Sequence, residues 1–471
     1  MKIMLKSLLA IALNFLAFSA SGSLSEQLDQ LMASLPEGSI QGVQVQEANS
    51  GQILYNRNIH YNLLPASTLK VLTAFVAYQS LGAEFRFQTR LLSQHKIYRK
   101  PVYKGDLTLQ FNGDPSLTHD DLIALLSVLS KEGVREIRGN IWLDNSAFDG
   151  YLRAGGTSWD DRNICFAAPT SAMILDRNCF FGWLRATKPG QKAKMEYDEP
   201  EWYTEVDNQI VTRKPLESEL LGCVQEVWPS QDYEYRLEGC ISPEREPMRM
   251  AFSVNNVERA VKRFVKSVLK RKGITLQGRV LVGRPKYTNK FLVSGHQSAP
   301  LPALLDRVLE KSDNLYADSL LKTLGRQLTG GAGSYYSGSK RIREVLNEAG
   351  VPLSRSRIVD GSGLSRYNLI SVEEMNRVLV VGWQQWGEKA PWLANRNQSE
   401  YWLKSGYLNG VNNMAGYAFP DDGEPLIFTV MLNGLRSEYP TNKEELKNFH
   451  NNIRTFHRSF LALLAAYNGR N

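Results

Sequence analysis

The sequence predicts an α/β fold of the α+β type, in which one antiparallel five-stranded sheet is flanked by helices and carries a long, mostly β insertion. Three observations lead to this prediction. A hairpin pattern and an apolar helix occupy residues 40–82, and residues 301–432 read as helices followed by three strands. The intervening residues 85–287 are rich in short strands and turn residues. Two early and three late strands can form one sheet, with the insertion leaving it through a loop.

The N-terminal elements begin with alternating residues at 40–46 and 52–55, separated by the turn residues Asn49-Ser50-Gly51. Such alternation around a glycine-containing turn is typical of a β-hairpin. An apolar helix follows, and we expect it to start at Ser67 and to end near Gly82.

The insertion is expected to form two small subdomains. Its strands and helices are separated by frequent Gly, Asp, Pro and Asn, which are typical of turns. The clearest strand patterns are at 107–111 and 140–143, and the clearest helical patterns are at 120–132 and 257–271.

The C-terminal part returns to helical periodicity from Leu301 to about Leu328. After this we expect a loop over 330–339, a helix over 340–349, a strand over 401–408 that carries Lys404 and is followed by a turn, strands at 410–419 and 425–432, and an amphipathic helix over 444–467. Residues 22–84 and 288–471 would thus form one discontinuous domain, which residues 85–287 interrupt.

The beginning of the chain resembles an export signal. Two lysines lie within the first six residues, residues 7–18 are largely apolar, and residues 19–23 are small. This order is typical of a secretory signal peptide, which we assign to residues 1–21. We therefore expect a periplasmic protein whose mature chain has no transmembrane segment.

The composition indicates which classes of partner the chain can have. Its 471 residues are 43% hydrophobic and 22% charged, with a net charge of +8, which is ordinary for a globular protein. The positive charge is compatible with loose association with an anionic envelope. We see neither an arginine-rich arm nor zinc-finger spacing, so nucleic-acid binding is not expected.

Four cysteines allow three disulfide pairings in an exported chain. Short loops close easily, which favours the pairs Cys165–Cys179 and Cys223–Cys240. Four reduced, buried cysteines are the alternative. None of the spacings is CxxC, so a redox or zinc site is not indicated.

The sequence Ser67-Thr68-Leu69-Lys70 predicts an activated nucleophile. Residues i and i+3 lie on the same face of a helix, so Lys70 can reach the Ser67 hydroxyl. A serine hydroxyl reacts only when a nearby group takes its proton. The spacing alone is weak, because Ser93–Lys96, Ser267–Lys270 and Ser337–Lys340 share it.

Two further motifs follow in order. Ser312-Asp313-Asn314 is a Ser-x-Asn motif, although Ser253-Val254-Asn255 has the same pattern. Lys404-Ser405-Gly406 is the one occurrence of Lys-[Ser/Thr]-Gly in the chain. The ordered set SxxK, SxN and K[ST]G is far more specific than any one of its members.

The ordered set resembles that of penicillin-binding proteins and serine β-lactamases. The long insertion between the first two motifs is most similar to the class C low-molecular-mass group, the D-alanyl-D-alanine carboxypeptidase/endopeptidases of peptidase family S13. The likeness extends to four further stretches: 111–117, 165–169, 176–180 and 360–366. It implies a β-lactamase/transpeptidase-like sheet that carries the site.

The resemblance implies a role for each catalytic residue. Ser67 would attack the carbonyl between two D-alanines and form an acyl-enzyme, with Lys70 as its base. Burial and the positive charge of Lys404 would help Lys70 to lose its proton. Ser312 would relay a proton to the departing D-alanine, and Asn314 would hydrogen-bond Lys70 and the substrate amide.

The third motif would bind the substrate. By the same resemblance, Lys404 and Ser405 of the Lys404-Ser405-Gly406 motif would hold the terminal carboxylate. The backbone N–H groups of Ser67 and Tyr407 would form the oxyanion hole, where one donor contributes on the order of 10²–10³ in rate. No metal or organic cofactor is implied. The expected partners are peptidoglycan stem peptides, with β-lactam antibiotics as covalent inhibitors.

Some features leave alternatives open. Asp161 could bind the ammonium group of a diaminopimelate side chain, or it could simply stabilise a loop. Residues 360–363 are expected to be a structural turn near the site. The third motif has Ser405 where the family usually has threonine, and the loop before Lys404 is shorter than usual. A non-catalytic peptidoglycan-binding scaffold, or a β-lactamase or esterase, therefore stays an alternative to the D-alanyl-D-alanine carboxypeptidase with endopeptidase activity.

Overall fold

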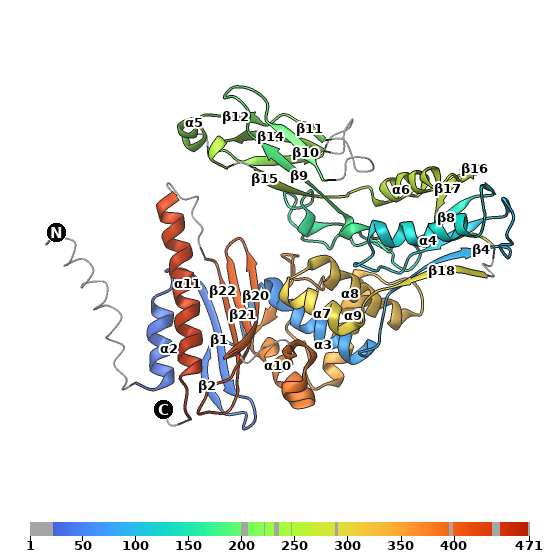
Figure 1. Cartoon of the computed structure of the whole chain (residues 1–471). Coiled ribbons are helices and arrows are strands. Elements are labelled where there is room, and N and C mark those ends of the chain that lie inside the picture. Colours follow the sequence, from blue (N-terminus) through green and yellow to red (C-terminus); the bar gives the residue numbers. More distant parts are fainter. Residues whose placement is uncertain are drawn as a thin grey trace. The chain divides into compact units, whose positions relative to one another are not determined.

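The computed structural model describes residues 22–198, 206–220, 222–229, 235–245, 247–287, 291–394, 399–435 and 443–469 (Figure 1). The chain divides into two compact units, one formed by Met1–Leu63 with Ser371–Asn471 and the other by Leu64–Ile370. The signal peptide predicted at residues 1–21 lies outside the described residues. Within the ranges given, no helix is both long and apolar enough to cross a membrane.

The first unit contains the predicted five-stranded antiparallel sheet. Its strands, in the order β2-β1-β22-β21-β20, are β2 (Ile53–Arg57), β1 (Ile40–Glu47), β22 (Leu426–Asn433), β21 (Val411–Ala418) and β20 (Tyr401–Leu408). Two early and three late strands therefore pair as the sequence predicts. The predicted strand that carries Lys404 and the turn after it are confirmed, because the strand ends at Leu408 and the chain turns at Asn409-Gly410, where Gly410 has a φ of +78°. An Asn-Gly pair favours a two-residue hairpin turn.

Helices cover both faces of this sheet (Figure 1). On one face lie α2 (Leu24–Ala33), which the sequence analysis missed, and α11 (Lys443–Ala465). They share an apolar core with the cross-strand pairs Val43–Val430 and Val45–Phe428. On the other face lies α10 (Val372–Trp386), whose Asn376 hydrogen-bonds Thr429 and Gln46.

The second unit contains a helical layer that carries two of the three motifs. Its helices are α3 (Lys70–Leu81), α7 (Leu301–Glu310), α8 (Asn314–Thr329) and α9 (Tyr335–Glu348). The helical pattern predicted over 301–328 is broken at Ser312, whose φ of +54° is left-handed and ends α7. The loop predicted over 330–339 is also too long, because Ser334 caps α9 in a capping box and buried Tyr335 begins it.

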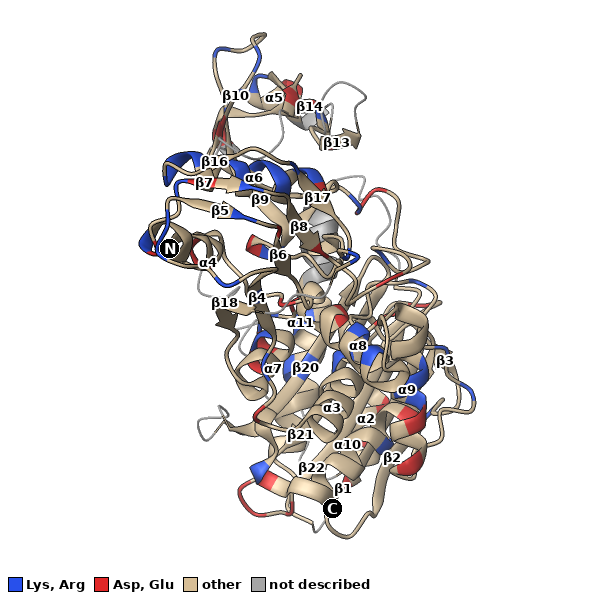
Figure 2. Ribbon diagram, turned by 90° about the vertical axis from the view of Figure 1, so that its right-hand side faces the viewer, with Lys and Arg blue, Asp and Glu red and all other residues tan. Residues whose placement is uncertain are grey.

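The remainder of the second unit is mostly β. One sheet has the order β17-β8-β6-β4-β18 and shares a core with α4 and α6. Figure 2 shows Lys and Arg residues along α6. The bounds in this sheet and its helices are β4 (Gln88–Ser93), β6 (Leu107–Gln110), α4 (His119–Lys131), β8 (Ile141–Asp144), α6 (Val257–Arg271), β17 (Val280–Val282) and β18 (Phe291–Gln297).

A second apolar cluster lies around β9, β14 and β15. Its elements are β9 (Cys179–Arg185), β10 (Lys194–Tyr197), β11 (Val206–Asn208), β12 (Val211–Thr212), α5 (Pro215–Leu220), β13 (Gln225–Pro229), β14 (Tyr235–Ile241) and β15 (Met248–Ser253). The short strands elsewhere are β3 (Asn62–Leu63), β5 (Val102–Lys104), β7 (Glu136–Arg138), β16 (Thr275–Leu276) and β19 (Ile370–Ser371). Residues 85–287 thus contribute to two separate apolar clusters, and their division into two subdomains stays a prediction.

Both disulfides expected from short loops are present. Cys165 is bonded to Cys179 and Cys223 to Cys240. The pairing predicted by loop length is therefore confirmed, and the alternative of four reduced cysteines is wrong.

Candidate active site

Ser67 lies in a short 3-10 turn, Ala66–Leu69, immediately before α3. The expected α-helical start at Ser67 is therefore displaced by three residues, and α3 begins at Lys70. The i, i+3 spacing nevertheless has the predicted effect, because the Lys70 Nζ lies 2.8 Å from the Ser67 Oγ. Ala66 has a left-handed φ of +48°, an unfavourable conformation for alanine that is typical of functional sites.

Lys70 is fully buried, and three oxygens surround its amine. Besides the Ser67 Oγ, these are the Asn314 Oδ1 at 2.7 Å and the Ser362 backbone oxygen at 2.6 Å. The structure thus brings the first and second motifs together. No sequence pattern predicts the Ser362 carbonyl, because a backbone acceptor has no side-chain signal.

The turn around Ser362 holds this arrangement in place. The Thr73 Oγ1 donates to the Gly361 oxygen at 2.7 Å, and the Gly361 N–H donates to the Asp318 Oδ1 at 2.9 Å. Gly363 has a φ of +80°, and a Cβ there would lie 1.8 Å from the Ala66 oxygen. Only glycine permits this approach. The expectation of a structural turn at 360–363 is confirmed.

Two buried carboxyl groups, those of Asp318 and Asp360, interact electrostatically with Lys70. Burial and then the charge of Asp360 raise the pKa of Asp318 to about 7, whereas the positive charge of Lys70 acts in the opposite direction. Burial also raises the pKa of Asp360, against hydrogen bonds that its carboxylate accepts from the backbones of Ser365 and Gly363. Asp318 lies one helical turn after Asn314 on α8, a spacing that could have identified it.

The second motif lies at the junction between α7 and α8. Ser312 is half-buried, and Asn314 is the first residue of α8. Within the part of the chain that the structure describes, no hydrogen bond joins Ser312 to Ser67 or Lys70. The geometry thus brings Asn314 to Lys70, and the role of Ser312 stays a prediction.

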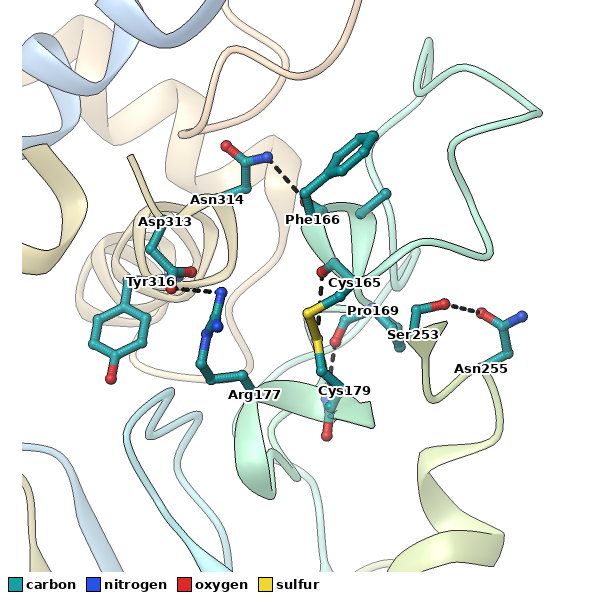
Figure 3. Close-up of a disulfide and its surroundings, with 12 residues drawn as sticks. Cys165, Phe166, Pro169, Arg177, Cys179, Ser253, Asn255, Asp313, Asn314 and Tyr316 are labelled. Carbon is teal, nitrogen blue, oxygen red and sulfur yellow. Dashed lines mark hydrogen bonds and ion pairs between the residues drawn. A yellow bond between two sulfur atoms is a disulfide. The ribbon is translucent and has the colours of Figure 1, made fainter. Parts of the chain in front are cut away.

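Asp313, the middle residue of the motif, anchors the junction. It is buried, caps α8 by accepting from the Tyr316 N–H, and pairs with Arg307 at 3.2 Å and Arg177 at 2.8 Å. The Asn314 Nδ2 donates to the Phe166 oxygen at 2.9 Å (Figure 3). Arg177 and Phe166 both belong to the predicted insertion. No sequence pattern gave a role to Asp313, Arg177 or Phe166.

The other Ser-x-Asn sequence is structural. Ser253 ends β15, and its buried hydroxyl donates to the Arg162 oxygen at 2.8 Å and to the Asn255 Oδ1 at 3.0 Å. Asn255 in turn donates to the Asn163 Oδ1 at 2.9 Å. Figure 3 shows Ser253 and Asn255 on the far side of the disulfide from Asn314.

Asp161 lies in the loop before the first disulfide. Its N–H donates to the Ser158 oxygen at 3.3 Å, and burial followed by the charge of Asp160 raises the pKa of its carboxyl group. Arg366, close to the turn at 360–363, acts in the opposite direction. Among the described contacts, none joins Asp161 to Ser67, Lys70 or Asn314, so its role as a diaminopimelate ligand stays a prediction.

The third motif lies on β20, the edge strand of the sheet in the first unit. Lys404 is buried, donates to the Ser405 backbone oxygen at 2.9 Å, and has a pKa that burial lowers to about 8. The Ser405 and Tyr407 residues are exposed, and Gly406 is buried. Lys404 and Ser405, predicted to bind the carboxylate, and Tyr407, predicted to donate to the oxyanion, thus lie on one edge strand.

No group of three or more His, Cys, Asp and Glu residues is arranged to hold a metal ion in the described ranges.

Comparison with known proteins identifies the family. Residues 24–394 match the D-Ala-D-Ala carboxypeptidase 3 (S13) family. The D-alanyl-D-alanine carboxypeptidase DacB of Haemophilus influenzae is 31% identical over 463 residues, which cover 93% of this chain and 95% of the relative. A D-alanyl-D-alanine carboxypeptidase from an Actinomadura strain is 28% identical over 84% of this chain and 78% of its own.

Solved structures agree with the sequence comparison. The crystal structure of penicillin binding protein 4 (dacB) from Haemophilus influenzae superposes with a TM-score of 0.84 at 30% identity, covering 93% of this chain and 99% of that one. The same protein complexed with a β-lactam gives a TM-score of 0.77 at 29% identity, covering 91% and 98%. The fold predicted from the motif order is therefore confirmed, and the chain belongs to the D-Ala-D-Ala carboxypeptidase 3 (S13) family of serine D-alanyl-D-alanine carboxypeptidases.

Proposed function

We propose that this protein hydrolyses the D-alanyl-D-alanine bond of peptidoglycan stem peptides through an acyl-enzyme on Ser67. The observation that carries the proposal is the 2.8 Å separation of the Lys70 Nζ from the Ser67 Oγ, with Lys70 fully buried. This is the geometry of a nucleophile and its base within hydrogen-bonding reach.

In the acylation step, Lys70 in its neutral form takes the hydroxyl proton as the Ser67 oxygen attacks the carbonyl carbon. An ester bond forms, the peptide C–N bond breaks, and the departing D-alanine nitrogen gains a proton. Ser312 is proposed to relay that proton. Asn314, which contacts Lys70 at 2.7 Å, is proposed to orient the amine and the substrate amide.

Residues of β20 are proposed to recognise the substrate end. Lys404 and Ser405, within the Lys404-Ser405-Gly406 motif, would bind the terminal carboxylate. The N–H groups of Ser67 and Tyr407 would stabilise the oxyanion of the tetrahedral intermediate. Asp161 would bind the ammonium group of a diaminopimelate side chain. These roles rest on the family resemblance.

Water then attacks the ester and releases the shortened peptide with Ser67 restored. The same two steps on the D-alanyl bond of a peptide cross-link would make the enzyme a D,D-endopeptidase. A β-lactam presents a strained amide to the same nucleophile, and the β-lactam complex of the Haemophilus relative supports covalent inhibition here. The predicted signal peptide at residues 1–21 supports a periplasmic location, where this substrate occurs.

The experiment is incubation of the mature protein with benzylpenicillin, followed by intact mass measurement and peptide mapping. One adduct per chain on the Ser67 peptide is expected, together with release of D-alanine from a muropeptide pentapeptide. Ser67→Ala should abolish both. Ser267→Ala, which changes another serine with SxxK spacing, is the matched control and should change neither. An adduct on another residue, or D-alanine release that survives Ser67→Ala, would refute the proposal.

The same experiment separates the alternatives. Rapid turnover of a chromogenic cephalosporin, without D-alanine release, would indicate a β-lactamase. Binding to sacculi by the wild type and by Ser67→Ala, without turnover by either, would indicate a scaffold.

A further inference from the structure

The positive charge of this protein is concentrated in one short segment. Residues 257–287 contain ten Lys and Arg and one Glu, a net charge of +9, whereas the whole chain has a net charge of +8. The remaining 440 residues, obtained by subtracting these 31 from 471, therefore have a net charge of −1. Such an asymmetry indicates a partner of opposite charge for this segment.

Helix α6, Val257–Arg271, presents four of these cations in a row. Arg259, Arg263, Lys266 and Lys270 recur at intervals of three and four residues, so they lie on one side of the helix. All four are exposed. From Arg259 to Lys270 the row extends for about 16 Å, at 1.5 Å per helical residue. Figure 2 shows Lys and Arg in blue along α6.

The opposite side of α6 is fixed in the protein core. On that side, α6 buries four residues in the apolar cluster that it shares with α4 and the sheet β17-β8-β6-β4-β18: Val261, Phe264, Val265 and Val268. The helix therefore cannot turn its apolar side outward, and any partner meets only the basic side. Further exposed cations continue beyond the row: Arg271, Lys272, Arg279, Arg284 and Lys286.

Within the described ranges, no ion pair neutralises the four cations of the row. The sole acid of the segment, Glu258, accepts a hydrogen bond from Asn145 at 3.4 Å. A surface with ten cations and one acid is therefore open to an external anion.

We propose that the basic side of α6 docks the protein on an anionic phospholipid surface. A bilayer presents phosphate groups over an extended plane, which matches an extended row of exposed cations. Lys266 and Lys270 also line a hollow beside Gly273, but that hollow is open to solvent rather than enclosed. A stem peptide that contains diaminopimelate has an ammonium group beside its carboxylates. A partner of mixed charge would be complemented by acids among the cations, and α6 offers one.

The attachment is electrostatic and reversible. The exposed side of α6 has no large apolar side chain that could enter the bilayer. Binding should therefore weaken steeply with salt, because the Debye length falls from about 10 Å at 0.1 M to about 3 Å at 1 M. It does not depend on the catalytic residues, so Ser67→Ala should bind as the wild type does.

The test is co-sedimentation of the mature protein with vesicles of phosphatidylcholine containing roughly one third phosphatidylglycerol, or of phosphatidylcholine alone. We expect binding to the anionic vesicles alone, and its loss in high salt. Changing Arg259, Arg263, Lys266 and Lys270 to Gln should weaken it about 10²–10³-fold, since each basic residue near such a surface adds roughly a fivefold increase. Cooperative thermal unfolding checks that this variant folds, and the pair Lys266→Gln/Lys270→Gln serves if it does not.

The matched control removes four exposed lysines elsewhere: Lys188, Lys192, Lys194 and Lys214, each changed to Gln. It has the same net charge as the α6 variant and should keep vesicle binding. An equal loss of vesicle binding in both variants would mean that binding depends only on net charge, and it would overturn the proposal. Absence of binding to anionic vesicles would also overturn it. So would an α6 variant that loses binding to purified sacculi but keeps binding to vesicles, because the partner would then be peptidoglycan.

Discussion

Arg177 and Asp313 form an ion pair in which the Arg177 Nη2 lies 2.8 Å from the Asp313 Oδ2, and this pair joins the predicted insertion to the second motif (Figure 3). Asp313 is buried and caps α8, so its position determines where Asn314 begins the helix. Asn314 in turn contacts Lys70 at 2.7 Å. The insertion thus acts on Lys70, the proposed base, through a short chain of contacts.

Arg177→Gln should therefore slow acylation by benzylpenicillin by about 10- to 100-fold, because small displacements of catalytic groups have effects of this order. Arg307 still pairs with Asp313 at 3.2 Å, so the variant should fold. Arg185→Gln, which removes an exposed arginine paired with Glu196, is the control and should acylate normally. Stopped-flow measurement of the acylation rate distinguishes them. Equal rates for both variants would mean that the ion pair serves stability alone.

The two disulfides should differ in their effect on catalysis. Cys165–Cys179 closes a loop of 14 residues, within which the Phe166 carbonyl accepts a hydrogen bond from Asn314. Cys223–Cys240 closes a loop of 17 residues in the other β cluster. Loops of this length contribute about 3 kcal/mol each to the free energy of unfolding in the chain-entropy model.

Changing both cysteines of a pair to serine should therefore destabilise the protein similarly in each case. Acylation should slow only in the Cys165→Ser/Cys179→Ser variant, because among the described contacts it is this loop that meets the second motif, through Phe166 and Arg177. Unfolding in urea and the acylation rate are the two measurements. A similar loss of acylation in both variants would contradict a positioning role for the first disulfide.

The features predicted from the sequence are those with a local or ordered signal. The i, i+3 spacing predicted that the Lys70 amine meets the Ser67 hydroxyl, and strand alternation predicted the five strands of the sheet. Both follow from short-range geometry, which does not depend on distant parts of the chain. The short-loop argument predicted both disulfides for a similar reason.

The features missed depend on long-range contacts through the backbone. The Ser362 and Phe166 backbone carbonyls accept hydrogen bonds from Lys70 and Asn314, and neither bond depends on the type of side chain at the accepting residue. The helix break at Ser312 was missed because its left-handed φ of +54° occurs at a residue other than glycine. Tertiary contacts of Asp313 hold this unfavourable conformation, and they appear only in the folded chain.

Gly363→Ala tests the turn that supports Lys70. Its Cβ would lie 1.8 Å from the Ala66 oxygen, so the turn or the Ser67 segment must move. We expect roughly a 100-fold loss of acylation and destabilisation by more than about 3 kcal/mol, as for other disrupted buried sites. Gly350→Ala is the matched control, since Gly350 has a similar φ of +82° and nothing within 4 Å of its Cβ.

The control should cost about 1–2 kcal/mol in the free energy of unfolding, the general penalty for a left-handed alanine. Its acylation rate should equal that of the wild type. Urea unfolding and acylation rates provide both comparisons. If Gly363→Ala behaved like Gly350→Ala, the close approach would have no catalytic importance.

The pKa of Lys404, which burial lowers to about 8, predicts a pH limit for carboxylate binding. Below about pH 8 the amine is charged and can pair with a substrate carboxylate, and above that value it becomes neutral. For an acyl-D-alanyl-D-alanine substrate, kcat/KM should therefore fall by about tenfold per pH unit above this limit.

The matched substrate has its terminal carboxylate converted to an amide, so the ratio of the two kcat/KM values isolates Lys404 from other titrations. Lys404→Arg keeps a positive charge at high pH and should extend the preference for the carboxylate. A ratio that does not change between about pH 7 and about pH 10 would exclude Lys404 as the carboxylate ligand.

The raised pKa of Asp318 predicts that the free energy of unfolding depends on pH, whether or not Asp318 takes part in catalysis. Burial and the neighbouring Asp360 raise its folded pKa from 3.8 to about 7. The folded state therefore binds this proton more tightly than the unfolded state, and the free energy of unfolding falls as pH rises from about 4 to about 7. Asp318→Asn removes the titration, so its stability relative to the wild type should improve by roughly 3 kcal/mol between about pH 4.5 and about pH 7.5.

Urea unfolding at both pH values measures this relative change, and Asp421→Asn, at an exposed aspartate, is the control that should show none. The asparagine introduced by Asp318→Asn can still accept from the Gly361 N–H, which keeps the turn beside Lys70 in place. If the wild-type and Asp318→Asn stabilities changed in parallel with pH, the buried carboxyl group would titrate near its ordinary value. The charge of Lys70 would then have to offset its burial, which would make Asp318 a charged partner of the Lys70 amine.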